Sequence, residues 1–321
     1  MSVRETTWRG LPALALQGGG RTAILGLVGG QLASLCFDGE EINPLWQPTW
    51  PAADPTSLDR HGLEVYGGGP DAPLLAAACG SFLCCDHFGP PAPGSGGSTH
   101  GEAAITRYVV SALDEATVVL SARLDRAALE VHRRFTWVGE ALELATTVRH
   151  QGSSPRVLDW CEHTTLGGAF LDTAAFTAAV DRVVASPWSG SRFPGQACGA
   201  DLDPTTALAM PGPAAQPWGD LVAARVAGGW WKVCSQSHRL TCTFDPEDWP
   251  WLTVWTEHRS RTNSPWQGRE RARGMELSTK PFPEAEPPPE RRRHWLGRPV
   301  ETAIPPDTAI TRRLRFQWEH A

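Results

Sequence analysis

The sequence has little of what marks membrane, secreted or nucleic-acid-binding proteins. No window in its 321 residues approaches the run of about 18 apolar residues that a membrane-spanning helix needs. The first residues, Met1 to Glu5, lack the apolar segment of a signal peptide. Lys and Arg number 29 against 35 Asp and Glu, and the one basic run is Arg291 to Arg293. We therefore expect a cytoplasmic protein that binds neither membrane nor nucleic acid.

The cysteines are also arranged in a way that excludes common functions. All eight are scattered without a CxxC pair, so we expect reduced, mostly buried thiols and no metal site. They are Cys36, Cys79, Cys84, Cys85, Cys161, Cys198, Cys234 and Cys242.

Motifs of nucleotide-binding and common hydrolytic enzymes are missing as well. The glycines Gly18 to Gly20 suggest a dinucleotide loop, but no long helical pattern follows them, and a βαβ unit requires one. The chain contains no Gly-x-Ser-x-Gly elbow, HExxH helix or phosphate loop. We expect no cofactor.

Long helical periodicity is absent, whereas short segments of alternating apolar and polar residues recur. Such segments, separated by turn residues, predict antiparallel strands with one buried face. The expected strands lie at 13–37 (two strands), 104–110, 116–124, 129–137, 141–148, 221–226, 230–235, 240–244, 251–255, 273–279 and 311–316.

This pattern predicts an all-β sandwich or barrel, because helices do not alternate with the strands. Three Pro-, Gly- or Ser-rich stretches, at 89–97, 204–217 and 284–290, are interpreted as loops within one architecture. A β domain often exceeds about 200–250 residues as one unit. We therefore expect a single domain over residues 1–321.

Three segments place titratable side chains beside glycine in β surroundings. The first contains His100 and Gly101, the second is Asp159 to Asp172 with His163, and the third contains Glu276 between Met275 and Leu277. A histidine can exchange a proton near neutral pH, and a buried carboxylate has a raised pKa unless it is paired. Each residue also has a structural interpretation, in which the histidines cap loops or core and Glu276 pairs with Arg273.

These segments, in this order, resemble the galactose mutarotase-like family, which includes aldose 1-epimerases. The resemblance runs from Asn43-Pro44-Leu45-Trp46, through His100-Gly101 and the His163 segment, to Glu276 and Pro283. It implies a large antiparallel β supersandwich with a sugar site in a cleft of the sheet.

The resemblance also implies roles for individual residues. Glu276 takes the place of the general base on the anomeric hydroxyl, His163 that of the acid on the ring oxygen, and His100 that of a sugar-binding histidine. His87 stands in the segment where the family carries an arginine, and Thr164 to Gly168 replace the asparagine that follows the acid.

Further substrate contacts are expected from aromatic and basic side chains. Trp46 and Trp160, with Trp50 and Trp266, offer apolar faces for sugar C–H groups, and Arg273 is expected near Glu276. The expected function is a metal-independent aldose 1-epimerase acting on an undetermined small sugar. The alternatives are a non-catalytic carbohydrate-binding protein on the same fold, a related sugar isomerase or lyase, and an interaction protein with a Trp-rich surface.

In the catalytic interpretation, His163 and Glu276 face one cleft, separated by roughly a sugar ring. A Glu276 sealed in the core against Arg273 would contradict it.

Overall fold

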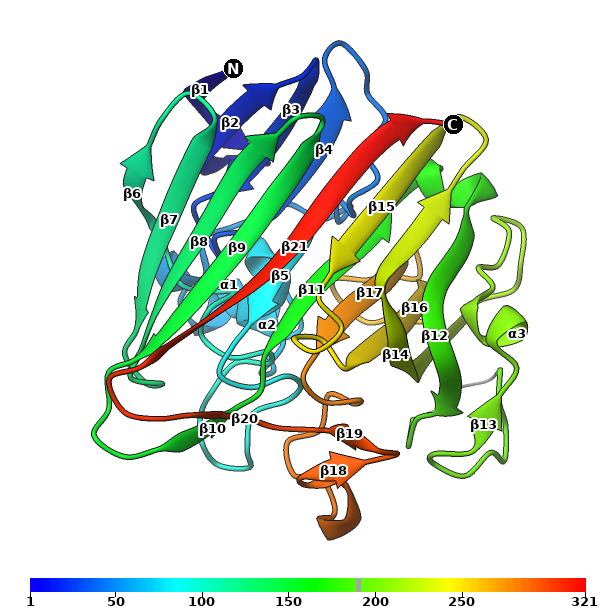
Figure 1. Ribbon diagram of the computed structural model, residues 1–321. Helices are drawn as coiled ribbons and strands as arrows, with labels where there is room; N and C mark the ends of the chain where they lie inside the picture. The colour runs from blue at the N-terminus through cyan, green and yellow to red at the C-terminus, as the bar shows by residue number, and fades with distance from the viewer. Residues whose placement is uncertain (189–191) are drawn as a thin grey trace.

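The computed structural model describes residues 1–188 and 192–321, which fold mainly into antiparallel strands (Figure 1). The prediction of an all-β, antiparallel sandwich is confirmed. The strands are β1 (Ser2–Trp8), β2 (Leu11–Gly18), β3 (Arg21–Gly26), β4 (Leu32–Phe37), β5 (Ser81–Cys84), β6 (Val109–Leu113), β7 (Thr117–Leu124), β8 (Leu129–Val138), β9 (Ala141–His150), β10 (Arg156–Leu158), β11 (Cys161–Gly167), β12 (Ala175–Ala185), β13 (Asp201–Leu202), β14 (Trp218–Cys234), β15 (His238–Phe244), β16 (Trp251–His258), β17 (Arg271–Ser278), β18 (His294–Trp295), β19 (Arg298–Pro299), β20 (Thr302–Ile304) and β21 (Ala309–His320).

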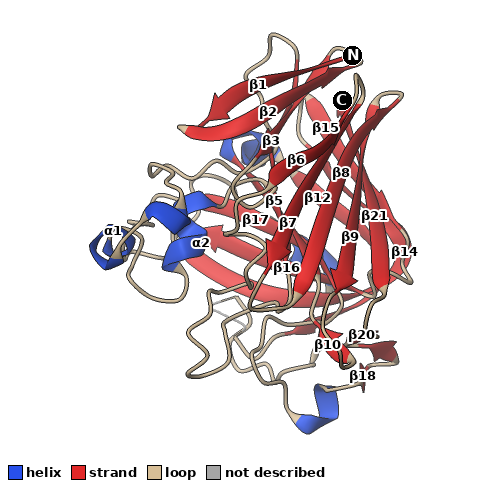
Figure 2. Cartoon of the chain, turned by 90° about the vertical axis from the view of Figure 1, so that its left-hand side faces the viewer, coloured by secondary structure: helices blue, strands red, loops and turns tan. Residues whose placement is uncertain are grey.

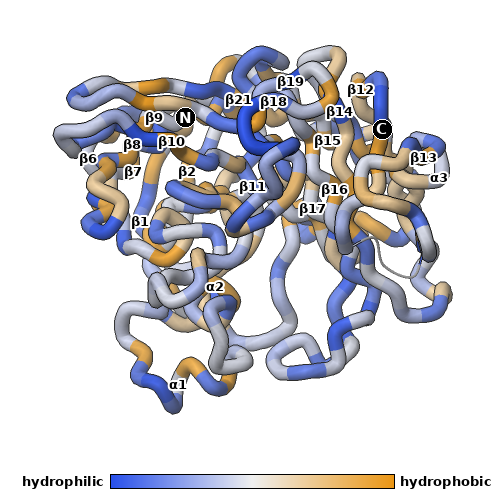
Figure 3. Tube along the Cα trace, turned by 90° about the horizontal axis from the view of Figure 1, so that it is seen from below, coloured by the Kyte–Doolittle hydropathy of each residue, from blue (hydrophilic) through white to orange (hydrophobic). Residues whose placement is uncertain are grey.

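Helices are few and short in the described residues. They are α1 (Arg60–Glu64), α2 (Ala72–Ala77) and α3 (Pro204–Leu208), with 3-10 turns η1 (Pro55–Ser57), η2 (Gly168–Thr173) and η3 (Pro289–Arg291). Figure 2 shows α1 and α2 together on one side of the strands, and in Figure 3 the α1 segment extends away from them. None of these helices is long and apolar enough to cross a membrane.

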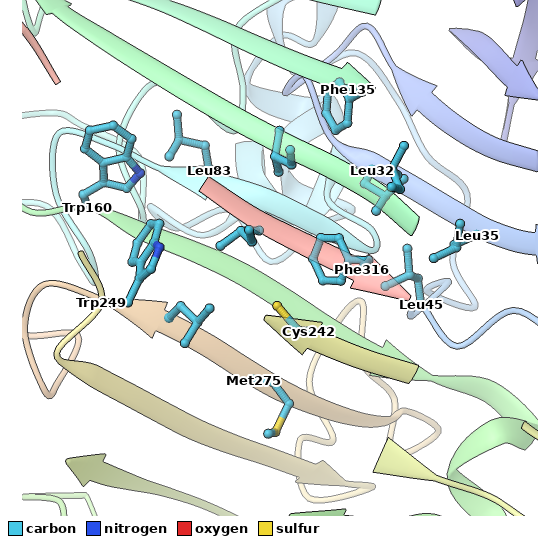
Figure 4. Packing of buried hydrophobic residues seen from close by; sticks show 14 of the residues in the cluster. Leu32, Leu35, Leu45, Leu83, Phe135, Trp160, Cys242, Trp249, Met275 and Phe316 are labelled. Carbon is cyan, nitrogen blue, oxygen red and sulfur yellow. The ribbon is translucent and has the colours of Figure 1, made fainter. Parts of the chain in front are cut away.

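Seventeen of the described strands join into one strongly curved sheet. One half runs β1–β2–β3–β4–β5–β11–β17–β16, and the other runs β15–β21–β9–β8–β7–β6. Strand β14 joins the halves, because residues 218–225 pair with β16 and residues 230–234 pair with β15. The main core lies between the two halves, where Met275 and Leu83 meet Phe135 and Phe316 (Figure 4).

The two strands expected at 221–226 and 230–235 are one continuous strand, β14, rather than two. The glycines Gly228 and Gly229 lie where β14 changes partner. A Cβ on Gly229 would meet the carbonyl oxygen of Phe244 at 2.1 Å, so the backbones approach too closely for a side chain. The glycines permit a close crossing of strands.

The strand expected at 104–110 is wrong for most of its length. Residues 102–106 form bends and turns, and β6 begins only at Val109. This segment lies beside the turn after β3 and makes one isolated bridge, between Val28 and Arg107. Its backbone groups form individual hydrogen bonds instead of a strand ladder, such as the one from the Tyr108 N–H to the Leu27 carbonyl at 2.7 Å. The expected strands at 116–124, 129–137 and 141–148 are confirmed as β7, β8 and β9.

A buried ion pair connects the two halves through the core. Arg133 on β8 and Glu162 on β11 are fully buried and form two parallel hydrogen bonds of 2.8 and 3.0 Å. Glu162 accepts a third hydrogen bond, from the Ser81 hydroxyl to Oε1 at 2.8 Å. This carboxylate is therefore satisfied inside the core and does not face His163, its neighbour in sequence.

We expect Glu162→Gln to destabilise the protein by about 3–5 kcal/mol, because it leaves the Arg133 guanidinium buried without its counter-charge. Denaturant unfolding measures this loss. Replacing both partners, Arg133→Met with Glu162→Leu, should restore most of it. Glu130→Gln on the exposed face of β8 is the control and should change stability by less than about 0.5 kcal/mol. A Glu162→Gln variant as stable as this control would contradict the role of the pair.

Candidate functional site

A row of side chains crosses four neighbouring strands on the outer side of the first half, away from the main core. The register places Phe82 of β5 opposite His163 of β11, and His163 opposite Glu276 of β17. Glu276 in turn lies opposite Thr253 of β16. Directly opposite residues of antiparallel strands point to the same face, so the sheet itself brings these groups together.

His163 and Glu276 are in direct contact. The His163 Nε2 lies 3.2 Å from Glu276 Oε1, and the other ring nitrogen, Nδ1, lies 3.0 Å from the Thr165 hydroxyl. The imidazole is also stacked on Phe82, with ring centres 4.5 Å apart. Both polar neighbours and the aromatic floor fix the ring orientation.

Burial controls the charge of this pair. It lowers the pKa of His163 to about 3 and raises the pKa of Glu276 well above its ordinary value. Arg261 acts in the opposite direction on Glu276 but with smaller effect. Burial therefore favours the uncharged form of both side chains. The contact places a potential acid beside a potential base.

Glycine at position 274 leaves room for the carboxylate. Gly274 precedes Glu276 by two residues on β17, so both positions face the same side of the sheet. A Cβ at Gly274 would lie 2.3 Å from Glu276 Oε1. The absent side chain thus permits the carboxylate to reach His163.

His100 joins the pair from a loop. Its ring centre lies 5.2 Å from that of His163, and its Nδ1 accepts a hydrogen bond of 3.1 Å from the Gly89 N–H. Because a backbone N–H can only donate, the neutral ring carries its proton on Nε2. Burial lowers the pKa of His100 well below its ordinary value, which keeps it neutral.

The loop around His100 needs glycine at the next position. Gly101 has a φ of +80°, and a Cβ there would lie 2.3 Å from the Cys85 carbonyl oxygen. In the sequence His100-Gly101, the histidine supplies the side chain at the cavity, and the glycine is required by the backbone conformation.

These groups line a cavity of about 200 Å³. This is below the roughly 300–1,000 Å³ of pockets for drug-sized ligands, so the cavity suits a small molecule such as one sugar ring. Its walls are formed by α2, by the loop before β6 and by aromatic side chains. They include Trp46, Asp71, Leu74, Phe82, Thr99, His100, His163, Thr165, Trp255, Arg261, Trp266 and Glu276.

An aromatic wall with one guanidinium closes one side of the cavity. Trp46 and Trp266 are stacked with ring centres 5.8 Å apart, and Arg261 lies 4.6 Å from the Trp266 ring and 5.2 Å from that of Trp255. Two hydrogen bonds hold Trp46 in place. Its backbone N–H donates to the Thr165 carbonyl at 2.8 Å, and its indole N–H donates to the Glu270 carboxylate at 2.8 Å. The wall thus offers flat apolar faces beside hydrogen-bond donors.

The structure brings His163, Glu276, His100, Trp46 and Trp266 to this cavity, but not Trp50, Trp160, Arg273 or His87. Trp160 has no exposed surface and packs edge-on against Trp249 in the main core (Figure 4). Arg273 is likewise fully buried, where its guanidinium bonds the Thr256 hydroxyl. Trp160 directly precedes β11, and Arg273 lies on β17. In the alternation of side chains along these strands, both residues point to the inner face of the sheet. We therefore remove both from the site.

His87 also lies outside the described lining of the cavity. Its Nε2 donates to the Ser98 carbonyl at 3.0 Å, and its Nδ1 lies 3.4 Å from Asp86. Those two contacts hold it within its own loop. It does not replace an arginine at the cavity.

The geometry differs from the expected one in a second respect. His163 and Glu276 touch, rather than standing a sugar ring apart. Glu276 is nevertheless not sealed against Arg273, because the two residues lie on opposite faces of β17 and Glu276 lines the cavity.

Sequence reasoning did not assign Phe82, Thr165, Trp255, Arg261 or Gly274 to the site. The alternation along each strand tells which residues share a face, but not which strands are neighbours. These residues reach the cavity through the pairing of β5, β11, β17 and β16, which spans distant parts of the chain.

Comparisons with known proteins place this fold. No protein-family profile matches the chain, and no curated protein sequence matches it. Solved structures do match. The mutarotase candidate YeaD from Salmonella typhimurium has 13% identity and a TM-score of 0.65, covering 100% of this chain and 94% of that one.

Two further solved structures agree. An aldose 1-epimerase candidate from Escherichia coli K12 has 11% identity and a TM-score of 0.63, with 100% of both chains covered. A galactose mutarotase-like protein from Clostridium acetobutylicum has 11% identity and a TM-score of 0.64, over 99% of this chain and 98% of that one. At such identities the likeness shows a galactose mutarotase-like fold and nothing finer.

Gly274→Ala should separate the carboxylate of Glu276 from His163, because the new methyl group takes the space of Oε1. We expect a folded protein in which any catalytic activity that depends on this contact falls by roughly 100-fold, as displacements of about 1 Å do. Gly212→Ala, at a position with open space around it, is the control. Equal activity of the two variants would show that the contact is not needed.

Proposed function

We propose that this protein, on its galactose mutarotase-like fold, interconverts the anomers of a small aldose by acid-base catalysis at His163 and Glu276. The observation that carries the proposal is their contact of 3.2 Å at the wall of a small cavity with aromatic sides. A paired acid and base with opposite pKa shifts is typical of proton-transfer sites.

The direct contact suits the chemistry of the anomeric carbon. The anomeric hydroxyl and the ring oxygen are bonded to the same carbon, so two adjacent protein groups can reach both from one side. In the proposed step the proton that burial favours on Glu276 first passes to His163 Nε2 through their contact. Glu276 then accepts the hydroxyl proton while His163 Nε2 donates its proton to the ring oxygen. The carbon–ring oxygen bond breaks and the aldehyde C=O forms, which leaves Glu276 protonated and His163 neutral.

The reverse transfer completes the cycle. The aldehyde group then rotates. The hydroxyl that formed from the ring oxygen attacks the other face of the aldehyde carbon. Its proton returns to His163, and Glu276 returns a proton to the carbonyl oxygen. The neutral pair that burial favours is the state present while the sugar is open, so burial lowers the cost of that intermediate.

Other side chains position the sugar. The Nε2–H of neutral His100 and the guanidinium of Arg261 supply donors, and the hydroxyl of Thr165 orients the His163 ring from Nδ1. Trp46 and Trp266 present flat faces that suit the C–H groups of a pyranose. This set fits a neutral, small carbohydrate and needs no metal ion in the proton-transfer steps.

A protein that binds the sugar without turning it over is the second candidate. The same contact favours it, because a closed His163–Glu276 pair leaves no gap for a ring between the two side chains. The difference between the candidates is a matter of turnover alone.

NMR exchange measurements of anomer interconversion across a panel of aldoses test the proposal. We expect acceleration over buffer for at least one sugar, and a loss of about 10²–10⁴-fold in Glu276→Gln and in His163→Asn. Glu276→Gln keeps the size of the side chain, and His163→Asn keeps a smaller polar side chain that does not exchange protons.

The matched control is a second His/Glu pair outside the cavity. His132 and Glu130 lie 3.3 Å apart on the outer face of β8, and His132→Asn with Glu130→Gln should leave the rate unchanged. Binding of a sugar, seen as a change in tryptophan fluorescence, without acceleration would select the binding-only candidate. Neither binding nor acceleration with any aldose would overturn both.

A further inference from the structure

Two histidines face each other across the pairing of β15 and β21, far from the cavity in the chain. The register makes His238, at the start of β15, the direct partner of His320, at the end of β21. Figure 1 shows these strand ends side by side next to the C-terminus. Directly opposite side chains share a face, so the two imidazoles lie together, with ring centres 5.0 Å apart.

A carboxylate from a third element completes the cluster. Glu40 follows β4 in a turn whose Gly39 has a φ of +82°, and this turn directs Glu40 toward both rings. Its Oε2 lies 2.9 Å from His238 Nε2, and its Oε1 lies 2.8 Å from His320 Nε2. One potential ligand atom of each residue lies within 4.8 Å of the others.

The orientation of each ring is fixed by groups other than Glu40. His238 is buried, is stacked on Trp318 with ring centres 4.8 Å apart, and places its Nδ1 2.8 Å from the Ser237 hydroxyl. His320 is stacked on Phe37 with ring centres 4.1 Å apart. Metal-binding histidines characteristically bond a second partner through the ring nitrogen that does not hold the metal, as His238 does here.

We propose that Glu40, His238 and His320 bind a divalent transition-metal ion, of which Zn²⁺ is the probe of choice. Two imidazoles and one carboxylate form a ligand set that zinc uses with a fourth position left open. Ligand atoms about 2.0–2.2 Å from Zn²⁺ lie roughly 3.3–3.5 Å apart at tetrahedral angles. The 2.8 and 2.9 Å contacts run to the two different oxygens of Glu40, and the ligand atoms lie within 4.8 Å of one another. The three side chains therefore adjust their positions when they surround an ion.

This site is independent of the proposed sugar chemistry, since none of its three residues lines the cavity. It departs from the sequence-based expectation of no metal, which considered cysteine spacing and not a histidine pair created by strand register. A bound ion would join the end of β21 to the turn after β4. Arg21 is a cation near the cluster, 4.6 Å from the Phe37 ring. It is engaged by other groups, because it donates to the Trp318 carbonyl at 2.9 Å and lies 3.6 Å from Glu140.

Calorimetric titration of the chelator-treated, full-length protein with Zn²⁺ tests the proposal. We expect one ion per chain, with release of protons, because Nε2 of both histidines must be free to bind the metal. His320→Ala and Glu40→Gln alter exposed side chains, so folding is kept. Each should weaken binding at least about 10-fold, since loss of even an outer-shell partner costs that much.

Two controls separate this site from other sources of binding. His132→Ala removes half of a His/Glu pair that lacks a third ligand and should leave the affinity unchanged. Cys36→Ser, on β4 beside Phe37, should also leave it unchanged. The proposal is overturned if the wild-type protein binds no stoichiometric Zn²⁺, or if Glu40→Gln and His320→Ala bind it as tightly as the wild type. In the first case the three residues form only a hydrogen-bonded link.

Discussion

The hydrogen-bonded register between β11 and β17 is the constraint on which the candidate site depends. It sets His163 opposite Glu276, and the adjoining strands add Phe82 and Thr253 to the same row. A slip of one residue would direct Glu276 to the inner face and Met275 to the cavity. The acid-base pair is thus a product of strand pairing, and the loops and α2 only enclose it.

The same strands serve two environments because their side chains alternate. On the inner face, Glu162 is satisfied by Arg133 and carries a charge within the core. On the outer face, one residue further along β11, His163 meets Glu276, which has no arginine or lysine within ion-pair distance among the residues that the structure describes. Burial then favours the neutral forms of both groups. The adjacent residues Glu162 and His163 therefore have different electrostatic partners, because their side chains point to opposite faces of the sheet.

Much of the fold could be predicted from the sequence, because the alternation in 116–124, 129–137 and 141–148 reports local strand geometry. His163, Glu276 and His100 could be chosen through the family resemblance, and the cavity brings those three together. Trp160 and Arg273 could not be placed correctly, since the face to which a residue points depends on the phase of a strand with respect to the core. The proposed ligand set of Glu40, His238 and His320 could not be found in the sequence, because the β15–β21 register pairs the two histidines and the turn after β4 adds Glu40.

The central claim is that burial favours the uncharged form of both His163 and Glu276, although the two side chains are in contact. Nitrogen-15 NMR of the His163 imidazole, assigned with His163→Asn, tests it most directly. Because burial lowers the pKa of His163 to about 3, the folded protein should show an uncharged ring throughout pH 8 to 5. In Glu276→Gln the ring should also stay neutral over this range, since burial is the main cause. Formation of the imidazolium with a midpoint near pH 6.5 in the folded wild-type protein would contradict the account.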